Sequence, residues 1–70
     1  MKGLSPRQKQ IIEYIIQYQE KNQIQPSIRE TAAALSLEAS YVAYAINVAI
    51  AKGYAERHGN RYLKFKMEGI

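Results

Sequence analysis

The spacing of apolar residues changes at Gly53, and this change limits the folds open to the chain. Before Gly53, isoleucine, valine and alanine recur at intervals of three and four residues, which is typical of helices with one buried face. After it, apolar and polar residues alternate in "RYLKFK", which is typical of a strand. The sequence therefore predicts a mainly α fold that ends in a small β-hairpin.

The first helix is expected at about residues 6–22. Ser5 can accept a free backbone N–H at its start, Pro6 suits the first turn, and Gln8 can close a capping box. The residue before Pro26 is disfavoured in a helix, so the polar stretch that precedes it ends the segment. Four isoleucines share one face and are expected in the core: Ile11, Ile12, Ile15 and Ile16.

Two more helices are expected, at about residues 28–35 and 40–52. Ser27 and Glu30 repeat the capping box at the start of the shorter helix. Gly53 follows the longer helix and suits the left-handed conformation that commonly ends a helix. The residues expected to face the core are Ile28, Ala32 and Leu35 in the second helix, and Val42, Ile46, Ala49 and Ile50 in the third.

The alternating segment is expected to form a hairpin over about residues 54–66, with His58, Gly59 and Asn60 at or near its tip. The chain of 70 residues has the size of one small domain. It contains no cysteine, so packing alone has to hold the fold. Three helices followed by a hairpin in a single domain, residues 1–70, predict a winged helix-turn-helix.

The net charge of +4 is concentrated at the two ends of the chain. Lys2, Arg7 and Lys9 lie near the start, and residues 52–66 hold five cations against one anion. Lysine and arginine gain free energy by displacing counterions from phosphates, so this distribution favours a polyanionic partner. Basic faces also serve solubility, so charge alone does not identify the partner.

The chain resembles the N-terminal DNA-binding domains of the LexA repressor family and their winged-helix relatives, over roughly Leu4 to Phe65. The resemblance rests on the order of three segments, "LSPRQKQII", "PSIRETAAALSL" and "AKGYAER". It implies that the third helix lies in the major groove of DNA and that the wing approaches the DNA backbone. Two features depart from the family's pattern. Ser36 stands where the family usually has glycine in the turn, and the stretch from Leu37 to the third helix is about one residue shorter than in the family.

The third helix supplies the candidate base-reading residues. At about 100° per residue, the side away from its buried face carries Ser40, Tyr41, Ala43, Tyr44 and Asn47. Asn47 can bond an adenine edge, Ala43 can meet a thymine methyl, and the Ser40 hydroxyl can bond a base or a phosphate. The tyrosines can bond phosphates; alternatively they pack against neighbouring helices, or they join Val48 and Ala51 in an apolar patch for a protein partner.

Candidate contacts with the DNA backbone lie at the start of the second helix and in the wing: Ser27, Arg29, Arg57, His58, Asn60, Arg61 and Lys64. Free amides at a helix start favour a phosphate, and the cations can pair with phosphates directly. As alternatives, Arg29 pairs with Glu30 or Glu38 on the surface, and the strand lysines protect a sheet edge. His58 has no second imidazole or thiol beside it in the sequence, which argues against a metal site.

We therefore expect sequence-specific binding of double-stranded DNA by a small transcriptional regulator, by analogy a repressor. One small domain is expected to act as a homodimer on DNA or with another regulatory protein. The alternative is a winged-helix module for protein–protein interaction, which captures another regulator through the tyrosine face of the third helix.

Neither an enzyme nor a cofactor is expected, because the six glutamates and the single histidine show no catalytic or metal-ligand spacing. In the LexA family a second domain with a serine–lysine self-cleavage centre follows this one, and because the sequence ends at Ile70 we expect no such protease domain here. No apolar run is long enough to cross a membrane, which favours a soluble intracellular protein. We expect it in the cytoplasm, as a protein of prokaryotic, phage or plasmid type.

Overall fold

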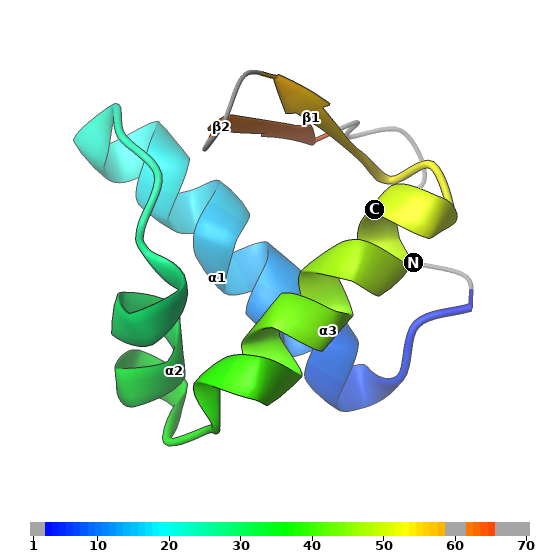
Figure 1. Ribbon diagram of the computed structural model, residues 1–70. Helices are drawn as coiled ribbons and strands as arrows, with labels where there is room; N and C mark the ends of the chain where they lie inside the picture. Colours follow the sequence, from blue (N-terminus) through cyan, green and yellow to red (C-terminus); the bar gives the residue numbers. More distant parts are fainter. Residues whose placement is uncertain (1–2, 59–61, 66–70) are drawn as a thin grey trace.

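The computed structural model describes residues 3–58 and 62–65, which form three helices followed by a two-stranded hairpin (Figure 1). The helices are α1 (Pro6–Asn22), α2 (Ile28–Leu35) and α3 (Ala39–Ala51), and the strands are β1 (Ala55–His58) and β2 (Tyr62–Phe65). Between α2 and α3 the chain turns by 111°, as in a helix-turn-helix. The fold is the predicted winged helix-turn-helix, with the hairpin as its wing.

No single helix among the described residues is both long and apolar enough to cross a membrane. Only α2 and α3 taken together reach that length and apolarity, and the 111° bend lies between them.

The helix boundaries lie close to those expected from the sequence. α1 and α2 have the expected ranges, and α3 begins and ends one residue earlier than expected, at Ala39 and Ala51. Glu38 occupies the N-cap of α3 without a side-chain hydrogen bond, so Ser40 lies inside the first turn. The hairpin begins and ends one residue inside its expected range, and His58 is the last residue of β1. The other expected tip residues, Gly59 and Asn60, lie outside the described residues.

Serines cap α1 and α2 as expected. At α1 the capping box is complete, because Ser5 Oγ accepts from the Gln8 N–H at 3.2 Å and Gln8 Oε1 accepts from the Ser5 N–H at 3.1 Å. At α2, Ser27 Oγ accepts from the Glu30 N–H at 3.0 Å. The Glu30 carboxylate accepts instead from the Tyr18 hydroxyl of α1 at 3.4 Å. Of the expected second capping box, only the hydrogen bond to the serine side chain is therefore formed.

A residue with a left-handed backbone follows each helix. Gln23 (φ 63°) and Ser36 (φ 57°) directly cap α1 and α2, and Gly53 (φ 83°) comes after Lys52 at the end of α3. After Ser36, the Leu37 N–H donates to the Ala32 carbonyl at 2.8 Å, as in a Schellman motif. Glycine adopts this conformation without strain, so Gly53 ends α3 as predicted. Serine carries a Cβ that is strained there, which makes Ser36 a costly residue at the turn of the helix-turn-helix.

The core lies where α1 and α3 cross beneath the hairpin (Figure 1). Its buried apolar side chains come from the three helices and both strands: Ile11, Ile12, Ile15, Ile16, Ala32, Val42, Ala45, Ile46, Ala49, Ala55 and Leu63. All four isoleucines predicted in α1 are buried, and burying each contributes roughly 1.5–3 kcal/mol relative to exposure.

Three apolar residues predicted in the core are not fully buried. Ile28 is 42% exposed, because it opens α2 and lines a cleft rather than facing α1. Leu35 and Ile50 are only partly buried and pack at the margin of the core. Thr31 and Ala45 are buried instead, and the Thr31 hydroxyl satisfies its hydrogen-bonding need by donating to the Ser27 carbonyl at 2.9 Å.

Two glutamines attach the wing to the helices. In the antiparallel hairpin, Ala55 lies opposite Phe65, and Leu63 is buried beneath the sheet. The Leu63 N–H donates to Gln25 Oε1 at 2.7 Å, and the Leu63 carbonyl accepts from Gln19 Nε2 at 3.1 Å. Gln19 Nε2 also donates to Gln25 Oε1 at 3.0 Å. The side-chain amides thus bond to β2 much as a neighbouring strand would.

Candidate nucleic-acid interface

The outward face of α3 is polar but uncharged. Ser40, Tyr44 and Asn47 are exposed, and Ala43 and Tyr41 are half-buried at the two edges of this face. The buried residues of α3 lie on its other side: Val42, Ala45, Ile46 and Ala49. The five residues predicted to read bases therefore lie on or beside the solvent face of one helix, as the helical period predicts.

The two tyrosines of α3 differ in burial. Tyr41 is half-buried and packs against the core, whereas Tyr44 is 57% exposed. Their ring centroids are 6.3 Å apart with the planes tilted by 37°, a favourable arrangement for an aromatic pair. The packing alternative therefore describes Tyr41, while Tyr44 offers its ring and hydroxyl to a partner.

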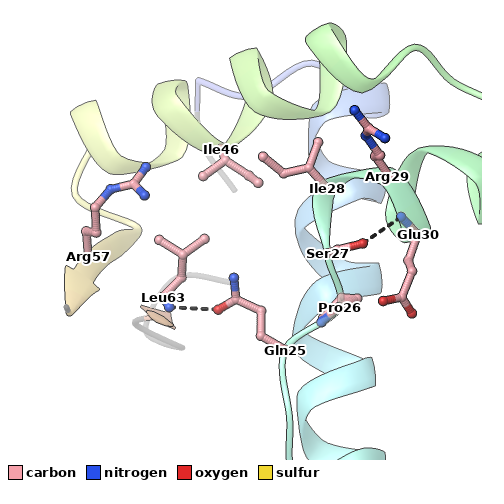
Figure 2. Close-up of a pocket in the computed structure, with 9 residues that line it drawn as sticks. All are labelled: Gln25, Pro26, Ser27, Ile28, Arg29, Glu30, Ile46, Arg57 and Leu63. Carbon is pink, nitrogen blue, oxygen red and sulfur yellow. Dashed lines mark hydrogen bonds between the residues drawn. The ribbon is translucent and has the colours of Figure 1, made fainter. Parts of the chain in front are cut away.

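A cleft of about 510 Å³ lies between the start of α2, α3 and the wing (Figure 2). Its apolar lining includes Ile28, Ile46 and Leu63. Arg29 and Ser27 line it from α2, and Arg57 lines it from β1. In Figure 2 the two guanidinium groups lie at opposite ends of the cleft. The fold thus brings cations from distant parts of the sequence to one surface beside α3.

Arg29 is exposed at the start of α2 and is open to a partner. Among the described residues no ion pair joins it to Glu30 or Glu38, the surface pair considered as the alternative to a phosphate contact. The Glu30 carboxylate instead faces the Tyr18 hydroxyl, and its negative charge raises the pKa of Tyr18 because it disfavours the phenolate. Ser27 is also exposed, although its Oγ already accepts the Glu30 N–H.

The residues of the wing that were predicted to contact the DNA backbone lie on two different faces of the hairpin. Successive side chains of a strand point to opposite faces, so Arg57 shares the face of its partner Leu63, toward the cleft. Lys64 lies opposite Glu56 on the other face, which His58 shares. His58 Nε2 is 3.4 Å from Glu56 Oε2, with both side chains about half exposed. Arg57 therefore lies toward the cleft, whereas Lys64 and His58 lie on the opposite face of the hairpin, beside Glu56.

The charged residues that flank α3 lie toward the start of α1. Glu38 and Arg7 line a second cleft of about 540 Å³, together with Tyr41. The Lys52 side chain lies against Gly3 in the N-terminal segment. Its Nζ is so close that the Cβ of any residue substituted for Gly3 would be 3.0 Å away. No charged side chain within α3 itself accompanies them.

Two candidates, Asn60 and Arg61, lie outside the described residues. The sequence reasoning missed Gln19 and Gln25, which position the wing. The sequence did contain a signal for Gln25. It precedes Pro26, and a residue before proline favours an extended backbone. An extended glutamine beside a small sheet can bond to its open edge.

A helix-turn-helix with a wing, and with arginines at both ends of the cleft beside α3, defines a winged helix-turn-helix domain. Residues 1–62 match the sequence model of the LexA DNA binding domain. Over 61 residues, 86% of the chain, the sequence is 41% identical to the LexA repressor of Herpetosiphon aurantiacus. The chain therefore belongs to the LexA DNA binding domain family, which confirms the resemblance seen in its motifs. It spans 28% of the length of that repressor.

Proposed function

We propose that the chain binds double-stranded DNA with sequence specificity and acts as the DNA-binding part of a transcriptional repressor. Membership of a DNA-binding family supports the partner, and the Herpetosiphon relative supports the repressor role. The observation that carries the proposal is the position of Arg29 and Arg57 at the two ends of a cleft beside the exposed face of α3. With α3 in the major groove, both guanidinium groups can meet phosphates that border it.

Affinity and base reading come from different residues in this proposal. Contacts to the DNA backbone come from Ser27, Arg29 and Arg57, with His58 and Lys64 of the wing. Asn60 and Arg61, which lie outside the described residues, are proposed to add to them. Base reading belongs to the exposed face of α3, through Ser40, Ala43, Tyr44 and Asn47, with Tyr41 packed beside Tyr44. Phosphate contacts hold a protein on any duplex, whereas contacts with base edges select a sequence.

Fluorescence anisotropy with a labelled random duplex across a salt series tests the binding. The logarithm of the association constant should fall linearly with the logarithm of salt concentration, by about 0.9 per phosphate contacted. Four contacts would give a slope near −4, which is easily separated from zero. An absence of binding even at low salt would contradict the proposal.

We further propose that the domain acts on DNA as a homodimer or beside another regulatory protein, because one small domain contacts only a single half-site. Binding-site selection checks this. A palindrome whose half-sites are centred about 34–36 Å apart supports a homodimer. A single unrepeated site argues for a monomer or a different partner.

Capture of another protein is a second candidate function, and one surface favours it. Tyr44 is 57% exposed, and Val48 and Ala51 lie near it on the uncharged side of α3. Tyrosine-rich surfaces without charge are typical of the centres of protein interfaces. If α3 binds a protein, substitution of Tyr44 should abolish that association and leave DNA affinity unchanged.

A further inference from the structure

We propose that α3 selects A·T base pairs in the major groove and makes no direct contact that selects guanine or cytosine. This inference rests on the proposed DNA binding and names the class of duplex that the domain prefers. Its basis is the set of side chains that α3 exposes, all of which lie within the described residues.

The exposed face lacks the groups that select G·C pairs. Guanine is selected by arginine or lysine donors to its O6 and N7 atoms, and cytosine by carboxylates that accept from its N4 amino group. Between Ala39 and Ala51 there is no arginine, lysine, aspartate or glutamate. The Ser40 hydroxyl can bond several base edges, so it adds contact without selection.

Charges next to α3 do not replace those groups. Glu38 lines the second cleft with Arg7, and Lys52 Nζ lies beside Gly3, both toward the start of α1. Arg29 and Arg57 belong to α2 and the wing and lie at the two ends of the other cleft, and the proposed function assigns them to phosphates. The base edges under α3 are therefore met by uncharged side chains.

Asn47 is the residue on this face that suits adenine. Its amide can donate to adenine N7 and accept from the N6 amino group at once, and its side chain is exposed. Ala43 and Ala51 lie one turn before and after it, about 6 Å along the helix in each direction. With α3 in the major groove, each of these methyl groups can meet the C5-methyl of a thymine near the contacted adenine. The same face can thus read an adenine with thymines beside it.

Modified duplexes test this reading on sites obtained by selection with the 70-residue chain. The selected half-sites should hold a run of A·T pairs under α3. Replacing the contacted adenine by 7-deazaadenine removes the N7 acceptor and should weaken binding roughly tenfold. Replacing thymine by uracil removes the methyl group and should weaken it by a smaller factor. Asn47→Ala should bind the adenine and 7-deazaadenine duplexes equally.

A gain of guanine selection provides the second arm of the experiment. Asn47→Arg should replace the enriched adenine with guanine at one position, because arginine bonds guanine O6 and N7 together. Gln17→Arg adds the same charge at an exposed position of α1 and should leave the selected sequence unchanged. The control separates a change in base reading from a general gain of charge.

The results separate the inference from the proposed function. Salt-dependent binding to selected sites that hold guanines or cytosines at fixed positions under α3 would overturn the A·T reading and leave DNA binding in place. A 7-deazaadenine effect that persists in Asn47→Ala would overturn the assignment of the adenine contact to Asn47. No binding to any duplex would overturn the proposed function, and the inference with it.

Discussion

At the scale of single residues, the turn between α2 and α3 contains an avoidable strain. Ser36 has φ 57°, and its backbone N–H donates to the Ala33 carbonyl at 3.3 Å. A residue with a Cβ costs roughly 1–2 kcal/mol in the left-handed region, while glycine pays a smaller entropic cost on folding. The serine therefore weakens the fold at the point where the two helices of the helix-turn-helix are joined.

Ser36→Gly should stabilise the domain by about 0.5–1 kcal/mol, because it removes this strain. In a domain of this size the melting temperature should rise by roughly 2–8 °C, measured by circular dichroism. Ser36→Ala keeps the Cβ and serves as the matched control, with little change expected. Equal melting temperatures for the glycine and alanine variants would show that backbone strain at this residue is not significant.

At the scale of elements, the wing depends on hydrogen bonds from outside its own sheet. A two-stranded hairpin is marginally stable by itself in water. Here the buried Leu63 bonds through both its N–H and its carbonyl to Gln25 and Gln19. These bonds hold β2 against the segment between α1 and α2, and so place Arg57 of the neighbouring strand at the cleft.

Gln25→Ala should destabilise the domain by about 1–2 kcal/mol, because it leaves the buried Leu63 N–H without its acceptor. The Leu63 amide should exchange its hydrogen much faster, as followed by NMR, while amides in the middle of α1 lose less protection. Gln17→Ala, at an exposed position of α1, is the control. Unchanged exchange at Leu63 in Gln25→Ala would mean that the hairpin is held by packing alone.

At the scale of the whole molecule, the surface separates groups that hold DNA from groups that read it. The cations of the cleft come from α2 and β1, while α3 carries none. Such a division predicts that affinity and sequence preference can be lost independently, since phosphate contacts carry no base information.

Arg29→Ala combined with Arg57→Ala should weaken binding to every duplex and reduce the salt slope by about 2, at about 0.9 per phosphate. Tyr44→Ala combined with Asn47→Ala should remove sequence preference and leave that slope unchanged. Anisotropy titrations with a selected and a random duplex measure both effects. Lys21→Ala, an exposed cation that lines neither cleft, is the control for general charge. A protein-binding role for α3 predicts instead that the second pair leaves all DNA binding unaltered.

Features with a local cause could be predicted from the sequence. The start of α1 follows from the Ser5 capping box, the end of α3 from Gly53, and the isoleucine face of α1 from helical periodicity. The outward face of α3 follows from the same periodicity, because its buried positions fix which side is left for solvent. Hydrogen bonds and side-chain directions within one or two turns decide these features, so neighbouring residues are sufficient to predict them.

Contacts between distant segments were decided only by the tertiary structure. Glu30 bonds to Tyr18 instead of completing its own cap, and Ile28 lines a cleft that forms only when α2 and the wing meet. The hydrogen bonds from Gln19 and Gln25 to the wing also join distant segments. The pairing of the two strands likewise decides that Arg57 and Lys64 lie on opposite faces of the hairpin. The physical reason is that each depends on packing between elements, which no local pattern encodes. By itself, then, the sequence determined the helices, their caps and the uncharged face of α3, and the tertiary structure decided which cations lie beside that face.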